Sequence, residues 1–208
     1  MFEQSAQLLE TLAPVVPVAD FVDEQHAIRV SQLYQQITVP SVEVTLRRDN
    51  AWLSFEQVRK ALPDRAIGVG TVINAEQLRK AKDLGASFAI SPGISAPLVE
   101  LAQSLDIAYV PGIATASELM LATQLGLKAV KFFPAEAAGG VKMLRSLIAP
   151  FPAMRFCPTG GISAANATDY LQLANVSCVG GSWVVPAPEQ LHESSDQVMA
   201  QLSALYRS

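Results

Sequence analysis

The sequence predicts one α/β domain folded as a closed (β/α)8 barrel with a short N-terminal helix. Strand-like and helix-like segments alternate eight times along the 208 residues, with no linker or change of composition between them. Half of the residues are hydrophobic and only 16% are charged, which indicates strands that are covered on both faces. Because right-handed crossovers repeated eight times close a sheet on itself, we expect residues 1–208 to form a single barrel of the TIM type.

The first two units show the pattern clearly. Residues 5–12 have the spacing of a short amphipathic helix, and the apolar residues 14–19 follow as the first strand. Asp23 is suited to cap a helix that runs to about residue 36. Apolar and polar side chains then alternate strictly in residues 41–47, so period two places three polar side chains on one face of this second strand: Glu43, Thr45 and Arg47.

The other units repeat this order, and most of their strands end at glycine or proline. The expected strands are residues 66–70, 87–91, 107–110, 128–133, 154–158 and 176–179. The expected helices are residues 52–62, 74–84, 95–105, 116–125, 141–149, 163–173 and 188–206. We expect Pro111-Gly112 to end the fifth strand and Gly180-Gly181 to follow the eighth.

An open, doubly wound sheet is the main alternative to the barrel. Such a sheet more often carries a glycine-rich phosphate loop after its first strand, and the first strand here has none. Gly68-Val69-Gly70 resembles the start of a dinucleotide fingerprint, but Ile73 stands where its third glycine would be. We therefore expect neither NAD nor FAD as a cofactor.

Composition and charge exclude several classes of function. The net charge is −4, and no cluster of lysine and arginine could neutralise a nucleic-acid backbone. The start of the chain lacks the basic and apolar regions of a signal peptide, and no apolar run reaches membrane-spanning length, so we expect a cytoplasmic protein without membrane contact. Cys157 and Cys178 lack a metal or redox spacing, and His26 and His192 have no second ligand nearby, so we expect no metal site.

Lys131 lies inside an apolar, β-prone run that Pro134 ends. Desolvation by Val130 and Phe132 disfavours the ammonium form, so the amine could attack a carbonyl carbon and form a Schiff base. The alternative is a lysine at the end of a strand whose stem lies on the core while its charge reaches water. This run alone does not decide between the two interpretations.

The barrel brings further polar residues to Lys131. Alternate strands of a barrel share layers of side chains, so Glu43 and Arg47 of the second strand can approach Lys131 of the sixth at the carboxyl end of the barrel, where such enzymes place their chemistry. A buried ion network that serves only stability is the alternative. Thr71 and Pro92 follow the third and fourth strands at the same mouth.

Two glycine-rich turns follow the seventh and eighth strands, where barrels often bind phosphate through backbone N–H groups. These turns are Pro158-Thr159-Gly160-Gly161-Ile162-Ser163 and Gly180-Gly181-Ser182-Trp183. The alternative is that the glycines only make tight turns and that Ser182 only caps a helix. Two such turns at adjacent strands favour a phosphate site.

Six motifs in order, between about Pro14 and Pro186, resemble those of the bacterial 2-keto-3-deoxy-6-phosphogluconate (KDPG) aldolases. They are Glu43-Val44-Thr45-Leu46-Arg47, Gly68-Val69-Gly70-Thr71-Val72, Ile90-Ser91-Pro92-Gly93, Val130-Lys131-Phe132-Phe133-Pro134-Ala135-Glu136, Pro158-Thr159-Gly160-Gly161-Ile162 and Gly180-Gly181-Ser182-Trp183. Two features depart from the family: residues 37–40 replace a glycine-containing approach to the second strand, and Arg48 replaces a small polar residue.

The resemblance implies a role for each site residue. Lys131 would form the Schiff base and Glu43 would be the general acid and base. Arg47 with Thr71 would hold the substrate carboxylate. The other expected contacts are Gly160, Gly161 and Ser182 for the phosphate, and Pro92, Phe133 and Thr159 around the pyruvyl part. The family further implies a homotrimer without a metal or other cofactor.

The expected activity is that of a lyase, a class I aldolase of the Entner–Doudoroff pathway that cleaves KDPG to pyruvate and glyceraldehyde 3-phosphate. The same residues could also cleave 2-keto-4-hydroxyglutarate (KHG) to pyruvate and glyoxylate. A phosphosugar isomerase or epimerase would share the barrel and the phosphate site but would need no buried lysine. A non-catalytic phosphosugar-binding barrel is the third possibility.

Overall fold

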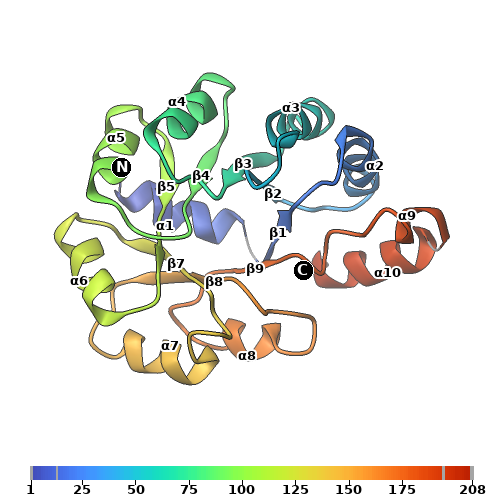
Figure 1. The fold of residues 1–208 in the computed structure, drawn as a ribbon. Helices are drawn as coiled ribbons and strands as arrows, with labels where there is room; N and C mark the ends of the chain where they lie inside the picture. Colours follow the sequence, from blue (N-terminus) through green and yellow to red (C-terminus); the bar gives the residue numbers. More distant parts are fainter. Residues whose placement is uncertain (1, 13, 194, 207–208) are drawn as a thin grey trace.

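The computed structural model describes residues 2–12, 14–193 and 195–206, and it has an α/β fold with parallel strands surrounded by helices (Figure 1). The strands are β1 (Val15–Ala19), β2 (Ser41–Thr45), β3 (Ala66–Gly70), β4 (Phe88–Ile90), β5 (Ala108–Val110), β6 (Gly112–Ile113), β7 (Ala129–Phe132), β8 (Arg155–Pro158) and β9 (Val179–Gly181). The helices are α1 (Phe2–Thr11), α2 (Glu24–Gln35), α3 (Ala51–Ala61), α4 (Ala75–Asp83), α5 (Ala96–Ser104), α6 (Ala116–Gln124), α7 (Gly140–Ile148), α8 (Ala167–Leu171), α9 (Gln190–Glu193) and α10 (Ser195–Tyr206).

The strands form two sheets. One has six strands in the order β5-β4-β3-β2-β1-β9, and the other has three in the order β6-β7-β8. Only Pro111 separates β5 from β6: Val110 pairs with Ile90 in the first sheet, and Gly112 pairs with Lys131 in the second. At the other edge, two isolated parallel bridges join β8 and the residue that follows it to the last strand region, Phe156 to Val176 and Thr159 to Gly180.

The fifth strand ends at Val110 before Pro111, as expected, but the sequence did not indicate β6, in which Gly112 belongs to a further strand directly after the proline. A proline lacks the N–H that a ladder needs on one side, but its carbonyl can still accept a hydrogen bond. The Lys131 N–H donates to the Pro111 carbonyl at 2.8 Å, so pairing resumes with the next strand directly after the proline.

Gly180 and Gly181 differ from expectation in a similar way. They were expected to follow the eighth strand, yet they belong to β9 and pair with Val16 and Pro17 of β1. The absence of side chains is what makes room here, because a Cβ at Gly180 would lie 2.3 Å from the Thr159 Oγ1 atom. Glycine is disfavoured in strands on average, so the propensity rule placed these residues in a turn.

Two of the expected helices also differ. The expected helix 163–173 is reduced to α8, because the Asn166 side chain accepts a hydrogen bond from the Ser163 N–H at 2.8 Å in a turn before the helix. The expected helix 188–206 is two helices, α9 and α10, and residue 194 between them lies outside the described residues.

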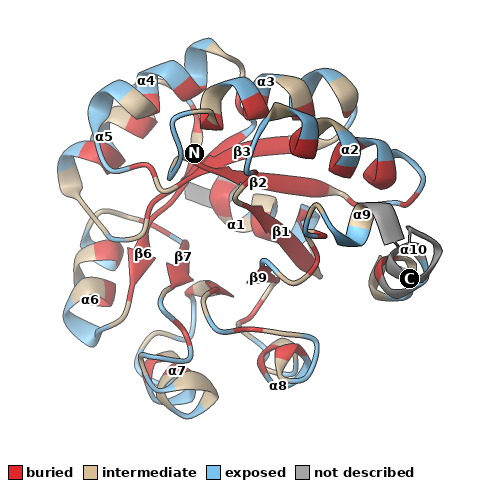
Figure 2. Ribbon diagram, turned by 45° about the vertical axis from the view of Figure 1, so that its right-hand side comes forward, coloured by how far each residue is buried: buried red, intermediate tan, exposed pale blue. Residues whose placement is uncertain are grey.

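Alternate residues of each strand pack into two different layers, as period two requires. The larger layer lies between the strands and the helices around them, and buried residues line the inner faces of those helices (Figure 2). The other layer is a separate cluster formed by these buried residues: Leu9, Leu12, Val16, Phe88, Ile90, Val110, Ala129, Cys157 and Cys178. Both cysteines are free thiols within it.

Helix α1 supplies Leu9 and Leu12 to this second cluster, which explains its amphipathic sequence. Its Ser5 hydroxyl donates a hydrogen bond to the Tyr109 carbonyl of β5 at 3.1 Å. The helix therefore covers one side of the strands, and the pocket described below lies at their carboxyl ends. None of the helices in the described ranges is long and apolar enough to cross a bilayer.

Candidate active site

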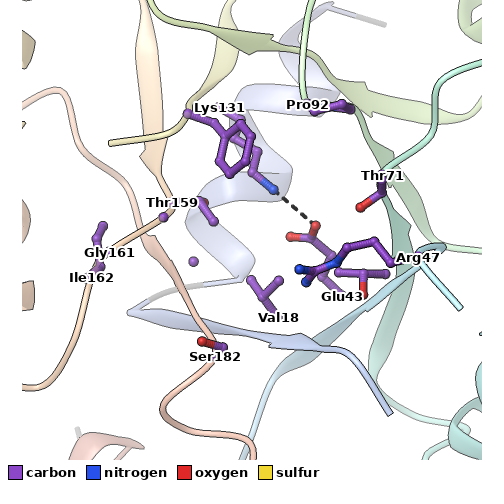
Figure 3. A pocket seen from close by; sticks show the side chains of 14 residues that line it. Val18, Glu43, Arg47, Thr71, Pro92, Lys131, Thr159, Gly161, Ile162 and Ser182 are labelled. Carbon is purple, nitrogen blue, oxygen red and sulfur yellow. Dashed lines mark hydrogen bonds and ion pairs between the residues drawn. The ribbon is translucent and has the colours of Figure 1, made fainter. Parts of the chain in front are cut away.

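A pocket of about 230 Å³ lies at the carboxyl ends of the strands (Figure 3). It is lined by Val18, Glu43, Thr45, Arg47, Thr71, Pro92, Lys131, Phe133, Thr159, Gly160, Gly161, Ile162, Gly180 and Ser182. All ten site residues expected from the sequence are among these, although they come from six separate segments of the chain. The fold thus brings the whole expected set into one cavity.

Lys131 and Glu43 meet in the centre of the pocket. The Lys131 Nζ atom donates a hydrogen bond to the Glu43 Oε1 atom at 3.1 Å, and the two residues are only 5% and 1% exposed. The Phe133 ring centroid lies 5.3 Å from the same nitrogen. Lys131 is therefore buried with a carboxylate partner, so the interpretation of a lysine that reaches water is wrong.

Gly70 of β3 makes the space in which the Glu43 carboxylate lies. A Cβ at position 70 would be 1.9 Å from the Glu43 Oε1 atom, well inside any allowed contact. In the sequence, Gly70 resembled part of a dinucleotide fingerprint, but in the structure its lack of a side chain serves the position of Glu43. It allows the carboxylate to approach both the sheet and the amine.

We predict that Gly70→Ala lowers kcat by roughly 100-fold, because the new methyl group displaces the Glu43 carboxylate and small displacements of catalytic groups carry such costs. The displaced atom ends a side chain, so the protein should still fold. Gly93→Ala is the matched control, since a Cβ at Gly93 meets nothing within 4 Å. Steady-state cleavage rates compare the two variants, and full activity of Gly70→Ala would contradict the tight fit.

Arg47 and Thr71 lie on one side of the ion pair (Figure 3). Arg47 stands in the turn after β2, and among the described residues it forms no ion pair with Glu43, so the charge network expected from the sequence contains only Lys131 and Glu43. Its exposed guanidinium is free to meet a carboxylate ligand. Thr71 has φ 63°, a region that β-branched residues rarely adopt and that often marks functional sites.

Arg48, the departure from the family pattern, turns away from the pocket. Its Nε atom donates to the Asp20 Oδ1 atom at 2.9 Å, and Arg48 does not line the cavity. The second departure also leaves the strand intact, because the Pro40 carbonyl accepts a hydrogen bond from the Ala66 N–H at 3.1 Å. Neither departure changes the residues that face the ligand space.

Thr159, Gly161 and Ser182 lie on the opposite side of the ion pair (Figure 3). Gly160 and Gly161 have φ values of 100° and 77°, in the left-handed region that favours glycine. Within the described part of the chain, the backbone N–H groups of Gly160, Gly161 and Ser182 donate no hydrogen bond to another protein group. Such free donors beside a cavity are suited to bind the oxygens of an anion.

Four lining residues were not expected from the sequence: Val18, Thr45, Ile162 and Gly180. Thr45 lies on the same face of its strand as Glu43 and Arg47, so the alternation of polar and apolar residues already indicated that Thr45 lines the site. Gly180 was placed in a turn instead of in β9. Val18 carries no polar group, and nothing in its apolar strand distinguishes it from a core residue.

Among residues 2–12, 14–193 and 195–206, no group of three or more histidine, cysteine, aspartate or glutamate side chains could hold a metal ion. The chemistry that the pocket offers is that of an amine, a carboxylate, a guanidinium and free backbone N–H groups. Together these groups suit a substrate that has a carbonyl between two anionic ends.

Comparison with known proteins gives a consistent result. The family model for KDPG and KHG aldolases matches residues 7–201. The KHG/KDPG aldolase of Escherichia coli strain K12 is 47% identical over 186 residues, which cover 89% of this chain and 87% of that protein.

Two solved structures show the same similarity in three dimensions. The KDPG aldolase of Zymomonas mobilis ZM4 with 3-phosphoglycerate has a TM-score of 0.90 and 36% identity, and covers 100% of this chain and 99% of its own. The KDPG aldolase of Legionella pneumophila, with pyruvate captured at low pH as a covalent carbinolamine, has a TM-score of 0.88 and 38% identity, and covers 95% and 96%. The similarity thus extends over almost the whole of both chains.

Proposed function

The chain belongs to the KDPG and KHG aldolase family, and from this we propose that it is a class I aldolase that cleaves KDPG to pyruvate and glyceraldehyde 3-phosphate. The observation that carries the proposal is the buried Lys131 amine, 3.1 Å from the Glu43 carboxylate, between a guanidinium and a glycine loop. The carbinolamine of pyruvate in the Legionella pneumophila aldolase is an adduct of the kind that Lys131 would form. An isomerase or epimerase would not need this lysine.

The first steps form the Schiff base. Glu43 accepts a proton from the Lys131 ammonium group, and the neutral amine then attacks the C2 ketone of the substrate. Loss of water from the carbinolamine leaves an iminium ion, and protonated Glu43 can supply the proton that the departing hydroxyl group needs. The hydrogen bond of 3.1 Å between the two groups allows the proton to pass between them in both directions.

Cleavage uses the iminium ion as the electron sink. Glu43 removes the proton of the C4 hydroxyl group, the C4 oxygen becomes the aldehyde carbonyl, and the electrons of the C3–C4 bond move to the iminium ion to form an enamine. Glu43 then returns a proton to C3, and hydrolysis releases pyruvate from Lys131. One carboxylate thus acts in turn as base and acid.

The two anionic ends of the substrate fit opposite sides of the pocket. Arg47 can hold the carboxylate by two parallel hydrogen bonds, with the Thr71 hydroxyl beside it. The free N–H groups of Gly160, Gly161 and Ser182 would bind the phosphate. Pro92, Phe133 and Thr159 would enclose the pyruvyl part next to Lys131.

KHG is a second substrate that we propose on the name of the relative from Escherichia coli. It shares the C2 ketone and the carboxylate that the lysine and Arg47 recognise, but it lacks the phosphate. We expect a higher KM for KHG than for KDPG for this reason.

We further infer that the two sheets form one closed (β/α)8 barrel in a single domain of residues 1–208. The single residue between β5 and β6 and the two parallel bridges next to β9 support this closure. An experimental structure in which β8 and the last strand lie apart would contradict it. Family membership also favours a cytoplasmic homotrimer that serves the Entner–Doudoroff pathway, and the mass of the purified protein in solution tests the trimer.

Reduction with borohydride in the presence of pyruvate tests the proposed chemistry. The iminium ion should be reduced to a stable secondary amine, and peptide mass spectrometry should place the adduct on Lys131. Pyruvate without borohydride and borohydride without pyruvate are the controls. Absence of an adduct at saturating pyruvate would overturn the Schiff-base mechanism.

A further inference from the structure

Behind the glycine loop lies a pair of side chains that the proposed chemistry does not use. The Tyr170 hydroxyl of α8 donates a hydrogen bond to the Glu136 Oε1 atom, in the segment between β7 and α7. Tyr170 is 0% exposed, whereas Glu136 is an exposed residue. Neither residue lines the pocket.

Glu136 supports the glycine loop from behind. Its N–H donates to the Gly160 carbonyl at 3.1 Å, and the N–H of Ala135 donates to the Thr159 carbonyl at 2.8 Å. The side chain packs against the loop as well, because a Cβ at Gly161 would lie 2.6 Å from the Glu136 Cβ atom. The position of the Glu136 side chain therefore limits where the loop backbone can lie.

Tyr170 fixes that side chain from the other end of the loop. The loop leads from β8 through Gly160 and Gly161 to α8, which carries Tyr170, so the hydrogen bond to Glu136 closes a ring of contacts around the loop. The start of α7 backs this ring, because a Cβ at Gly140 would lie 3.3 Å from the Glu136 Oε1 atom and 3.5 Å from the Tyr170 hydroxyl oxygen.

The hydrogen bond from Tyr170 also restrains the negatively charged carboxylate of Glu136, which is unfavourable beside a phosphate. A carboxylate beside an anion-binding loop repels a phosphate, and a hydrogen bond that engages one of its oxygens reduces its freedom to turn toward the ligand. Burial, followed by the hydrogen bond to Glu136 and the charge of that residue, raises the pKa of Tyr170 far above its ordinary value. The hydroxyl group thus keeps its proton and remains a donor.

We propose that Glu136 and Tyr170 are positioning residues that hold the glycine loop in the geometry that binds phosphate, and thereby set the preference for phosphorylated over unphosphorylated keto acids. This inference rests on the proposed function. To the proposed function it adds a pair of residues outside the pocket that would affect the binding of only one end of the substrate, the phosphate. Among the described residues, the side chains of Lys131 and Glu43 form their hydrogen bond with each other and none with Glu136 or Tyr170.

Tyr170→Phe tests the proposal by removing the hydroxyl group and keeping the ring. The KM for KDPG should rise by about tenfold, the scale of one hydrogen bond to a charged group, with kcat within about twofold of the wild-type value. The inhibition constant of inorganic phosphate should rise in the same proportion. The KM for KHG and the yield of the borohydride adduct with pyruvate should stay unchanged.

Glu136 gives an independent arm of the test. Glu136→Gln keeps the packing and an oxygen that accepts the Tyr170 hydrogen bond, and it removes the charge that repels a phosphate, so it should not raise the KM for KDPG. Glu136→Ala keeps the Cβ atom that packs against the loop but removes the accepting oxygen, so it should raise that KM as Tyr170→Phe does. If Tyr170→Phe does not fold, the comparison of Glu136→Gln with Glu136→Ala still tests the proposal.

Tyr206→Phe is the control, since it also removes a tyrosine hydroxyl group that donates a hydrogen bond. The acceptor of the Tyr206 hydroxyl is the Val15 carbonyl at 3.0 Å. This variant should leave the ratio of KM values for the two substrates unchanged. Equal effects of Tyr170→Phe and Glu136→Ala on KDPG and KHG would show a merely structural role and overturn the inference. Cleavage of KDPG by the wild-type protein, and the borohydride adduct that the wild-type protein forms with pyruvate, test the proposed function separately from this inference.

Discussion

Lys131→Ala should abolish cleavage, with kcat/KM reduced by more than about 10⁴-fold, as is common when a nucleophile that acts together with its base is removed. Without the amine there is no iminium ion to accept the electrons of the C3–C4 bond. Coupled detection of released pyruvate measures the loss. The borohydride adduct with pyruvate should disappear in the same variant.

Lys128→Ala is the matched control for this variant, because Lys128 is exposed and lies just before β7. It should cleave at the wild-type rate. Lys131→Ala leaves the buried Glu43 without its partner, and a broken buried pair costs about 3–5 kcal/mol, so circular dichroism must show that the variant is folded. Lys131→Met, which keeps the length of the side chain, serves if it is not. Residual turnover within tenfold of wild type in a folded variant would remove Lys131 from the mechanism.

Glu43→Gln should lower kcat by roughly 10²–10⁴-fold, the usual contribution of a general acid or base. The amide keeps the shape of the side chain but cannot take the proton of the C4 hydroxyl group. Some pyruvate adduct should still form on Lys131, because the amine remains in place. Rapid-mixing measurements of adduct formation and of cleavage separate these two effects.

Exchange of the C3 protons of pyruvate in deuterated water provides a second readout for Glu43→Gln. This exchange requires the same carboxylate but no cleavage of a carbon–carbon bond, so its rate should fall together with kcat. Gln57→Glu, a change of similar size on the outer helix α3, is the control and should leave both rates unchanged. Exchange at the wild-type rate in Glu43→Gln would assign the base to another group.

The sequence predicted most of the site because its key residues carry strong local signals. Lys131 stands alone in an apolar run, Glu43 and Arg47 alternate with valine and leucine, and the double glycines at 160 and 161 interrupt the chain after a strand. Each signal is weak by itself. Their order along the chain made them specific, and the pocket brings all of them together.

What the sequence did not predict depends on contacts between distant segments. Gly112 and Gly180 were expected to lie beyond the ends of strands, yet both belong to strands: Gly112 pairs with Lys131 of β7, and the approach of Thr159 requires the glycine at 180. The hydrogen bond between Tyr170 and Glu136 likewise joins residues 34 positions apart. No periodicity within one segment could indicate such pairs.

The two members of the central ion pair belong to different sheets: Lys131 lies on β7 of the three-stranded sheet, and Glu43 lies on β2 of the six-stranded sheet. In the proposed mechanism the proton therefore passes between strands of two different sheets whenever it moves from one residue to the other. A change in the packing between the two sheets would lengthen this proton path while leaving each residue in place within its own strand. The proposed chemistry thus depends on both sheets, and neither sheet contains the ion pair alone.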